Sequence, residues 1–172
     1  MSVSPPLQTI TVGVVVERSK GVTQWSEFVW RPVGVLVGEP DAPPWSKLSE
    51  EAERVTFYAG AADVELHRTE ADNYRNNLMT ETPQLWVALR PTGAEPPYEL
   101  FTVTADPAEG EALTEAGSDL IEPVPMPPAI QDVLAAFVAE HHVDQAFVKR
   151  KRDRADPEAL ARRSPIHDHE KR

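Results

Sequence analysis

The segment after Leu66 holds the densest group of side chains able to bind a ligand or transfer a proton. In chain order these side chains are His67, Arg68, Glu70, Tyr74, Arg75 and Asn77. On a helix that begins near Thr69, residues three and four positions apart share a face, so Glu70, Tyr74 and Asn77 point the same way. This pattern has two interpretations. It predicts either a docking patch for a ligand or partner at a strand-to-helix junction, or a solvated helix face with Tyr74 half buried.

The sequence contains none of the short motifs that identify common active sites. It lacks GxSxG, HExxH, GxGxxG and any Walker-type phosphate loop. It has no cysteine, which excludes thiolate metal sites, iron–sulfur ligation and a persulfide-carrying role. His141 and His142 are adjacent on a predicted helix, and side chains about 100° apart cannot easily share one ion. We therefore predict no catalytic residue, no metal site and no cofactor.

Aromatic and basic side chains mark two further candidate surfaces. Trp25 and Trp45 fall in predicted loops, where an indole either covers the core of its own domain or anchors a partner. The basic run near the C-terminus is interrupted by Asp153, and it either solvates the chain or docks on an acidic partner. Its members are Lys149, Arg150, Lys151, Arg152 and Arg154.

Charge is distributed unevenly along the 172 residues, whose net charge is −11. Residues 1–147 carry eight Lys and Arg against 23 Asp and Glu, whereas residues 148–172 carry nine against five. A body this acidic repels phosphate backbones, so we expect no nucleic-acid partner. No stretch approaches the roughly 20 apolar residues of a membrane span, and the N-terminus lacks the pattern of a secretory signal. We expect a cytoplasmic protein.

Alternating and helical hydrophobic patterns predict the order β-β-β-β-α-β-β-α-β-α. We expect a helix over about 70–78 with Thr69 as its N-cap, and a second over about 107–116 between Asp106 and Gly117. A third helix begins at Pro128, since apolar residues then recur every three or four positions. The predicted strands are 9–17, 27–37, 55–58, 64–67, 84–90, 98–104 and 120–124.

These elements predict an α+β fold with a mostly antiparallel sheet of about six to seven short strands. We expect this sheet to curl toward a barrel and a long C-terminal helix to pack on it. The first two strands should form an antiparallel pair, with Pro32 at an edge or a bulge because proline cannot donate to a ladder. Residues 1–147 are predicted to be one globular domain, and residues 148–172 a basic, disordered tail.

Several short motifs resemble a bacterial domain-of-unknown-function family over about residues 9–152. The resemblance rests on Val14-Val15-Val16-Glu17-Arg18, Trp30-Arg31-Pro32-Val33, Glu65-Leu66-His67-Arg68, Tyr74-Arg75-Asn76-Asn77-Leu78, Val124-Pro125-Met126-Pro127-Pro128 and Phe147-Val148-Lys149-Arg150-Lys151-Arg152. Members of that family are encoded beside formate-dehydrogenase-type molybdoenzymes, and some are labelled molybdopterin-guanine dinucleotide biosynthesis proteins. The resemblance implies a link to molybdoenzymes but supplies no established active site.

The biosynthesis label does not fit the residues. A guanylyltransferase needs a glycine-rich loop after its first strand to hold nucleotide phosphates, whereas residues 17–22 contain one glycine. The resemblance therefore favours a non-catalytic accessory protein whose partner is the molybdoenzyme or one of its maturation factors. The alternative is a small-molecule-binding protein or enzyme, linked to molybdenum cofactor metabolism. Its pocket would lie around His67, Arg68, Glu70, Tyr74 and Arg90.

Overall fold

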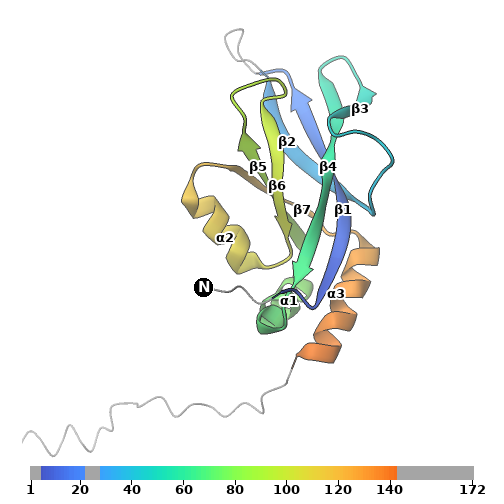
Figure 1. Cartoon of the computed structure of the whole chain (residues 1–172), viewed down its shortest axis with the longest axis vertical. Coiled ribbons are helices and arrows are strands. Elements are labelled where there is room, and N and C mark those ends of the chain that lie inside the picture. Colours follow the sequence, from blue (N-terminus) through green and yellow to red (C-terminus); the bar gives the residue numbers. More distant parts are fainter. Residues whose placement is uncertain (1–4, 22–27, 143–172) are drawn as a thin grey trace, which may run out of the picture. The chain divides into compact units, whose positions relative to one another are not determined.

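Two antiparallel sheets form the centre of the computed structural model, which describes residues 5–21 and 28–142 (Figure 1). The first sheet has the strand order β2-β1-β4-β3 and the second has the order β6-β5-β7. The strands of the first sheet are β1 (Gln8–Ser19), β2 (Val29–Val37), β3 (Ser46–Glu50) and β4 (Arg54–Leu66). Those of the second are β5 (Gln84–Pro91), β6 (Tyr98–Thr104) and β7 (Leu120–Pro125).

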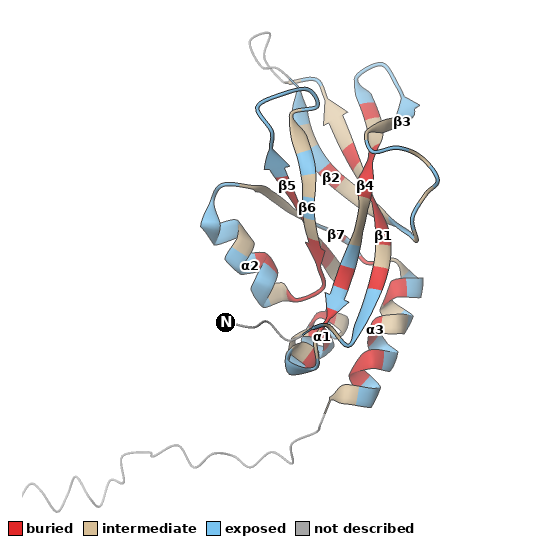
Figure 2. Ribbon diagram, in the orientation of Figure 1, coloured by how far each residue is buried: buried red, intermediate tan, exposed pale blue. Residues whose placement is uncertain are grey.

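Alternation of side chains along the strands builds one core between the two sheets. In β1, Ile10, Val12, Val14 and Val16 are buried, because every second residue of a strand points to the same face. Leu85, Val87 and Leu89 of β5 face them from the second sheet and belong to the same hydrophobic cluster. In Figure 2 buried residues recur along β1 and β4, and exposed residues lie mainly at the ends of these strands.

Three α-helices and one 3₁₀ turn complete the described fold. They are η1 (Arg68–Glu70), α1 (Ala71–Leu78), α2 (Pro107–Ala116) and α3 (Pro128–His141). The predicted limits of α2 are confirmed: the Asp106 side chain accepts a hydrogen bond from the Ala108 N–H, and Gly117 has the left-handed φ of 76°. None of the helices in the described ranges has the length and apolar character needed to cross a membrane.

The α+β class and the antiparallel sheets are confirmed, but the expected barrel is not. Within residues 5–21 and 28–142, no ladder joins β4 to β6 or β2 to β7, so the two sheets remain separate. The long C-terminal helix is not confirmed either, since α3 has 14 residues. It lies beside α1 at one end of the sheets (Figure 1), and its side chains Ile130, Leu134 and Phe137 enter the core there.

The order of elements is as predicted, but two strand assignments were wrong. One strand was missed and one strand was divided in two, so the number of strands still agrees. The structure contains one strand that was not predicted, β3. The predicted strands 55–58 and 64–67 are parts of one continuous strand, β4. Thr69 is not a helix N-cap, because it lies inside η1, and Glu70 precedes α1 without a capping side-chain hydrogen bond. The expectation for Pro32 is confirmed: β2 is an edge strand, and its register with β1 shifts next to Pro32.

The chain divides into two units, Met1–His142 and Val143–Arg172. The predicted boundary between residues 147 and 148 lies outside the described residues, as does the predicted tail. That part of the domain assignment stays a prediction.

Candidate functional site

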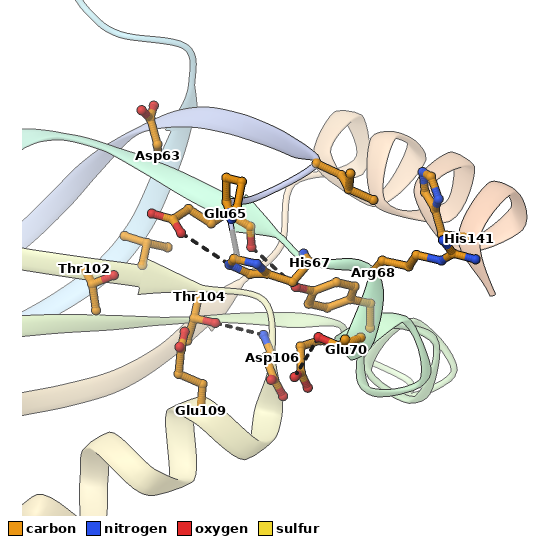
Figure 3. Close-up of a pocket in the computed structure, with 15 residues that line it drawn as sticks. Asp63, Glu65, His67, Arg68, Glu70, Thr102, Thr104, Asp106, Glu109 and His141 are labelled. Carbon is orange, nitrogen blue, oxygen red and sulfur yellow. Dashed lines mark hydrogen bonds and ion pairs between the residues drawn. The ribbon is translucent and has the colours of Figure 1, made fainter. Parts of the chain in front are cut away.

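A pocket of about 820 Å³ opens where β4 and β6 end and the helices begin (Figure 3). Its walls come from the last residues of β4, the η1 turn, the end of β6 and the start of α2, and His141 of α3 also contributes. Four residues that the sequence singled out line it together: His67, Arg68, Glu70 and Tyr74. The pocket therefore gathers the strand-to-helix junction with elements that are distant in the sequence.

Carboxylates dominate the lining of this pocket. Five of them come from β4, η1 and the capped start of α2, and they face one arginine, Arg68, and the two histidines His67 and His141. The carboxylates are Asp63, Glu65, Glu70, Asp106 and Glu109. Like charges gathered in a concave site focus a negative potential, which raises the local concentration of cations. The pocket is consequently suited to a positively charged group.

The period of a β-strand explains how β4 presents its part of the site. Asp63, Glu65 and His67 alternate with the buried Val64 and Leu66, so their side chains lie on the face away from the core. A contact with the neighbouring strand β1 orients Asp63, because the Thr11 hydroxyl donates a hydrogen bond to Asp63 Oδ1 at 2.7 Å. Glu65 Oε1 lies 3.3 Å from His67 Nε2, an ion pair when the imidazole is protonated.

Tyr74 of α1 lies at the buried side of the pocket and is 1% exposed. Its hydroxyl accepts a hydrogen bond from the His67 N–H at 3.0 Å and donates to the Glu65 carbonyl oxygen at 3.4 Å. The pKa of Tyr74 is raised to about 12, mainly by burial and in smaller part by the charges of Asp106, Glu70 and Glu109, while the His67 hydrogen bond acts in the opposite direction. A neutral tyrosine therefore fixes the end of β4 beneath a negatively charged surface.

Local hydrogen bonds also hold the carboxylates contributed by the helices. Asp106 caps α2 through the Ala108 N–H at 2.9 Å, and its own N–H donates to the Thr104 hydroxyl at 3.1 Å. Glu70 Oε2 accepts from the Asn73 side-chain amide at 3.0 Å. Since these groups are held before any ligand arrives, less side-chain entropy is lost on binding.

Asn77 is a structural residue in this fold and does not line the pocket. It is 3% exposed, and its amide nitrogen donates to the carbonyl oxygens of Gln84 at 2.8 Å and Ala105 at 2.9 Å. Its side-chain oxygen accepts from the Gln84 N–H at 3.1 Å. The three bonds tie α1 to the start of β5 and the end of β6. Arg75, on the same helix, is exposed and is not among the pocket-lining residues.

Arg90 lies away from the other predicted residues. Its guanidinium pairs with Asp119, with Nε 3.2 Å from Oδ1, and stacks 3.6 Å from the ring centroid of Phe101. In the β5–β6 ladder Trp86 is opposite Thr104 at the pocket, and Arg90 is four residues further along, about 13 Å away. Of the five residues predicted to form a pocket, His67, Arg68, Glu70 and Tyr74 line it. Arg90 lies outside the pocket.

Trp45 belongs to an aromatic cluster at the other end of the first sheet. Its ring packs edge-on against Trp30 at 5.9 Å and lies 6.2 Å from Phe57. Trp45 is partly buried against the core, and a role as partner anchor stays a prediction. Trp25 lies outside the described residues, as do the basic residues Lys149, Arg150, Lys151, Arg152 and Arg154.

The carboxylates of the pocket could bind a cation. The imidazole of His67 beside the Glu65 carboxylate could in addition transfer a proton. Among the residues that the structure describes, no three histidine or carboxylate side chains are grouped to hold a metal ion. The sequence reasoning missed most of the lining residues, including Thr102, Thr104 and Glu109. The alternation of Asp63 and Glu65 with apolar neighbours was the available signal, because it places both carboxylates on one face of a strand.

The comparisons with known proteins give one match. A family model described as "Protein of unknown function (DUF3305)" matches residues 11–151. Neither the curated proteins nor the solved structures contain a match to this chain.

Proposed function

Because this chain belongs to the DUF3305 family, which is described only as of unknown function, we propose its function from the pocket. The protein is a non-catalytic accessory protein that binds a partner protein through the acidic pocket at the end of β4 and β6. The observation that carries this proposal is the convergence of five carboxylates from three separate elements, β4, η1 and the capped start of α2, on one cavity. The group that this cavity accepts is a lysine- or arginine-bearing segment of the partner.

The electrostatics of the pocket supports a basic partner over an anionic ligand. A nucleotide or pterin phosphate needs several donors or cations around it, whereas Arg68 is the single arginine or lysine of the lining. The raised pKa of Tyr74 is in part an effect of the nearby carboxylates Asp106, Glu70 and Glu109. These carboxylates repel a phosphate and attract an ammonium or guanidinium group.

The identity of the partner rests on the family resemblance of the sequence motifs. Similar proteins are encoded beside formate-dehydrogenase-type molybdoenzymes, so the proposed partner is such an enzyme or one of its maturation factors. In this proposal the protein acts in the cytoplasm. Its contribution is to assist maturation or regulation, and the pocket carries the contact.

Affinity purification of the tagged full-length protein from its native host tests this proposal. Three strains are compared: the unchanged protein, a pocket variant and a surface-charge control. The pocket variant carries Asp63→Asn, Glu65→Gln and Glu109→Gln, all at exposed lining positions. The control removes three exposed carboxylates outside the pocket, through Glu81→Gln, Glu115→Gln and Asp132→Asn. Both variants lose the same charge.

We expect molybdoenzyme subunits or maturation factors to co-purify with the unchanged protein and the control, and to be lost from the pocket variant. Circular dichroism and thermal unfolding of the three purified proteins verify that the variants are folded. Recovery of no molybdoenzyme subunit or maturation factor with the unchanged protein contradicts the proposed partner. Equal recovery with the pocket variant contradicts the role of the pocket.

A second candidate function is the binding of a small cationic molecule. The size of the cavity favours it, since about 820 Å³ is within the range of small-molecule sites. The Glu65 carboxylate beside His67 would then pair with the positive charge of the ligand. Calorimetric titration of the full chain with spermidine, and of the pocket variant in parallel, distinguishes this candidate. Saturable binding that the pocket variant loses supports it, and the absence of saturable binding excludes spermidine-like polyamines.

A further inference from the structure

Aromatic rings surround Arg18 at the end of the first sheet that carries β3, away from α1 and α3 (Figure 1). Arg18 lies two residues after the buried Val16 of β1, so its side chain is on the same face of the strand. Its guanidinium carbon is 4.2 Å from the ring centroid of Phe28, 5.3 Å from that of Phe57 and 5.7 Å from that of Trp30. These four residues form the Arg18 cluster, which holds one cation among three rings.

Stacking on the rings does not use the hydrogen-bond donors of Arg18, because the N–H groups of a guanidinium lie in its plane. The Nε atom is buried and has no hydrogen-bond partner within the described part of the chain. No carboxylate of residues 5–21 and 28–142 forms an ion pair with Arg18, and its neighbour Glu17 pairs with Arg31 at 3.8 Å. A buried donor of a charged group is costly to leave unpaired. The Arg18 Nε–H therefore lacks an acceptor that a bound group can supply.

Basic residues gather in the first sheet at this end of an otherwise acidic body. Five of the eight Lys and Arg of residues 1–147 lie there, against four glutamates among the described residues. The basic residues are Arg18, Lys20, Arg31, Lys47 and Arg54, and the glutamates are Glu17, Glu50, Glu51 and Glu53. Two glutamates are already engaged, Glu17 with Arg31 and Glu50 with Lys47. This end of the sheet consequently attracts a single negative charge, in contrast to the acidic pocket.

The backbone of Trp45 is strained beside the Arg18 cluster. Its φ of 69° lies in the left-handed region, which bulky side chains rarely adopt. The indole is thereby placed edge-on against Trp30, with the ring centroids 5.9 Å apart. Strained residues of this kind persist where the surrounding structure fixes them, and they are frequent at binding sites. Trp45 thus supports the wall of the cluster at a cost in backbone free energy.

Exposed apolar side chains border the cluster. Phe28, Val29 and Leu48 are 53%, 51% and 49% exposed, and they are three of the eight large apolar side chains that the described structure leaves exposed. Aromatic residues and arginine are enriched at the centres of protein–protein interfaces. One unpaired guanidinium framed by apolar surface fits a protein segment with a single carboxylate. It does not fit a phosphate group, which needs several donors or cations.

We propose that the Arg18 cluster binds an acidic segment of a partner protein, with one aspartate or glutamate carboxylate on the guanidinium. The carboxylate accepts two parallel hydrogen bonds, from Nε and from one terminal nitrogen of Arg18. Its apolar neighbours in the segment pack on Val29 and Leu48. Phe28 precedes β2 and lies outside the ladder, so its ring turns aside to admit the carboxylate. This surface is separate from the acidic pocket, and the inference goes beyond the proposed function without depending on it.

Peptide titration of the isotope-labelled, full-length protein tests this inference. NMR spectra follow the Nε–H signal of Arg18 and the indole N–H signals. The parent probe is the capped pentapeptide Gly-Phe-Glu-Phe-Gly, and its twins carry glutamine or phosphoserine in place of glutamate. Arg18→Lys keeps the charge but loses the planar fork, and it also assigns the Arg18 signal. Arg54→Lys, at an exposed position of the same sheet end, is the matched control.

We expect the parent peptide to shift the Arg18 signal saturably and the glutamine twin to bind about tenfold more weakly, since a charged bidentate pair is lost. Arg18→Lys should weaken binding of the parent peptide by a similar factor, whereas Arg54→Lys should leave it unchanged. The phosphoserine twin should bind no more tightly than the parent.

Three results would overturn the inference. They are the absence of a saturable shift with the parent peptide, equal binding of the glutamine twin, and tighter binding of the phosphoserine twin. Each of these comparisons uses the unchanged protein, so the outcome holds even where Arg18→Lys does not fold. Equal binding of the parent peptide by folded Arg18→Lys would also contradict the role of the guanidinium.

Discussion

The hydroxyl oxygen of Tyr74 accepts a hydrogen bond from the backbone N–H of His67 at 3.0 Å. This contact joins α1 to the residue that follows β4, and it orders the junction at which the pocket is built. The ring of Tyr74 also packs edge-on against Phe137 of α3 at 5.8 Å, so one side chain connects the strand end with two helices.

Replacing Tyr74 by phenylalanine tests the importance of this hydroxyl. The ring and its packing remain, but the partly buried His67 N–H loses its acceptor. We expect Tyr74→Phe to lower the free energy of unfolding by about 1 to 2 kcal/mol, measured by urea denaturation at pH 7. Phe137→Tyr would not serve as a control because it adds a buried hydroxyl, so the Tyr98→Phe change at a partly buried position is used. An unchanged midpoint for Tyr74→Phe would show that the hydroxyl contributes nothing.

Tyr74 also predicts a particular dependence of stability on alkaline pH. Its folded-state pKa is raised to about 12, whereas the ordinary value is 10.0. The folded protein therefore retains this proton longer than the unfolded chain, and the related stability is complete below pH 10 and lost as pH rises toward 12. Unfolding measured from pH 9 to 12 should show a steeper loss for the unchanged protein than for Tyr74→Phe. The buried Tyr58, whose pKa is also raised, is present in both proteins and cancels in the comparison.

Asn77 and Asn76 form a matched pair of adjacent positions on α1. Asn77 is buried and makes three side-chain hydrogen bonds to backbone groups of Gln84 and Ala105, whereas Asn76 is exposed. We expect Asn77→Ala to cost about 2 to 4 kcal/mol, because buried backbone groups lose their partners. Asn76→Ala should change the free energy of unfolding by less than about 0.5 kcal/mol. Similar effects of the two substitutions in denaturant unfolding would refute the structural role of Asn77.

Gly110 of α2 packs against Trp86, which makes its response to alanine opposite to that of an ordinary helical glycine. Alanine normally stabilises a helix interior by about 1 kcal/mol relative to glycine. At Gly110 an added Cβ would lie 2.5 Å from Trp86 Cγ, so either the helix or the indole must move. We expect Gly110→Ala to destabilise the protein by about 1 to 3 kcal/mol.

Gly34 of β2 provides the control for this substitution. An added Cβ at Gly34 meets no atom within 4 Å, and its φ is not in the left-handed region. Gly34→Ala should therefore be neutral or stabilise by up to about 1 kcal/mol. Thermal unfolding of both variants checks the pair. A stabilising Gly110→Ala change would mean that α2 moves freely away from Trp86.

Hydrophobic alternation predicted β1, β5 and β6 well because each has its own buried side chains. β3 was missed for the opposite reason: Ser46–Glu50 has no buried residue, and it is a strand because it pairs with β4. The small residues Ala59, Gly60, Ala61 and Ala62 resemble a loop in the sequence. In the structure they continue β4 through a bulge opposite Val14 and Val15, where Gly60 has a φ of 133°.

The candidate site was predictable only where its residues are neighbours in the sequence. His67, Arg68, Glu70 and Tyr74 were found because a strand-to-helix junction brings them together locally. Thr104 and Glu109 approach them through the packing of β6 and α2, which no local pattern encodes. Asn77 was assigned to the same polar surface as Tyr74, yet it turns inward because backbone groups of β5 and β6 offer it three hydrogen bonds.

The pairing of β1 with β4 has a consequence for the order in which the protein forms during translation. The pairing runs from Ser19 opposite Arg54 to Gln8 opposite Leu66, so it is complete only when the chain has been made as far as Leu66. Ile130, Leu134 and Phe137, which complete the core, are synthesised later still. The nascent chain therefore carries open, valine-rich strands for most of its elongation, a state that associates readily with other chains. The core is therefore complete only after α3 has left the ribosome.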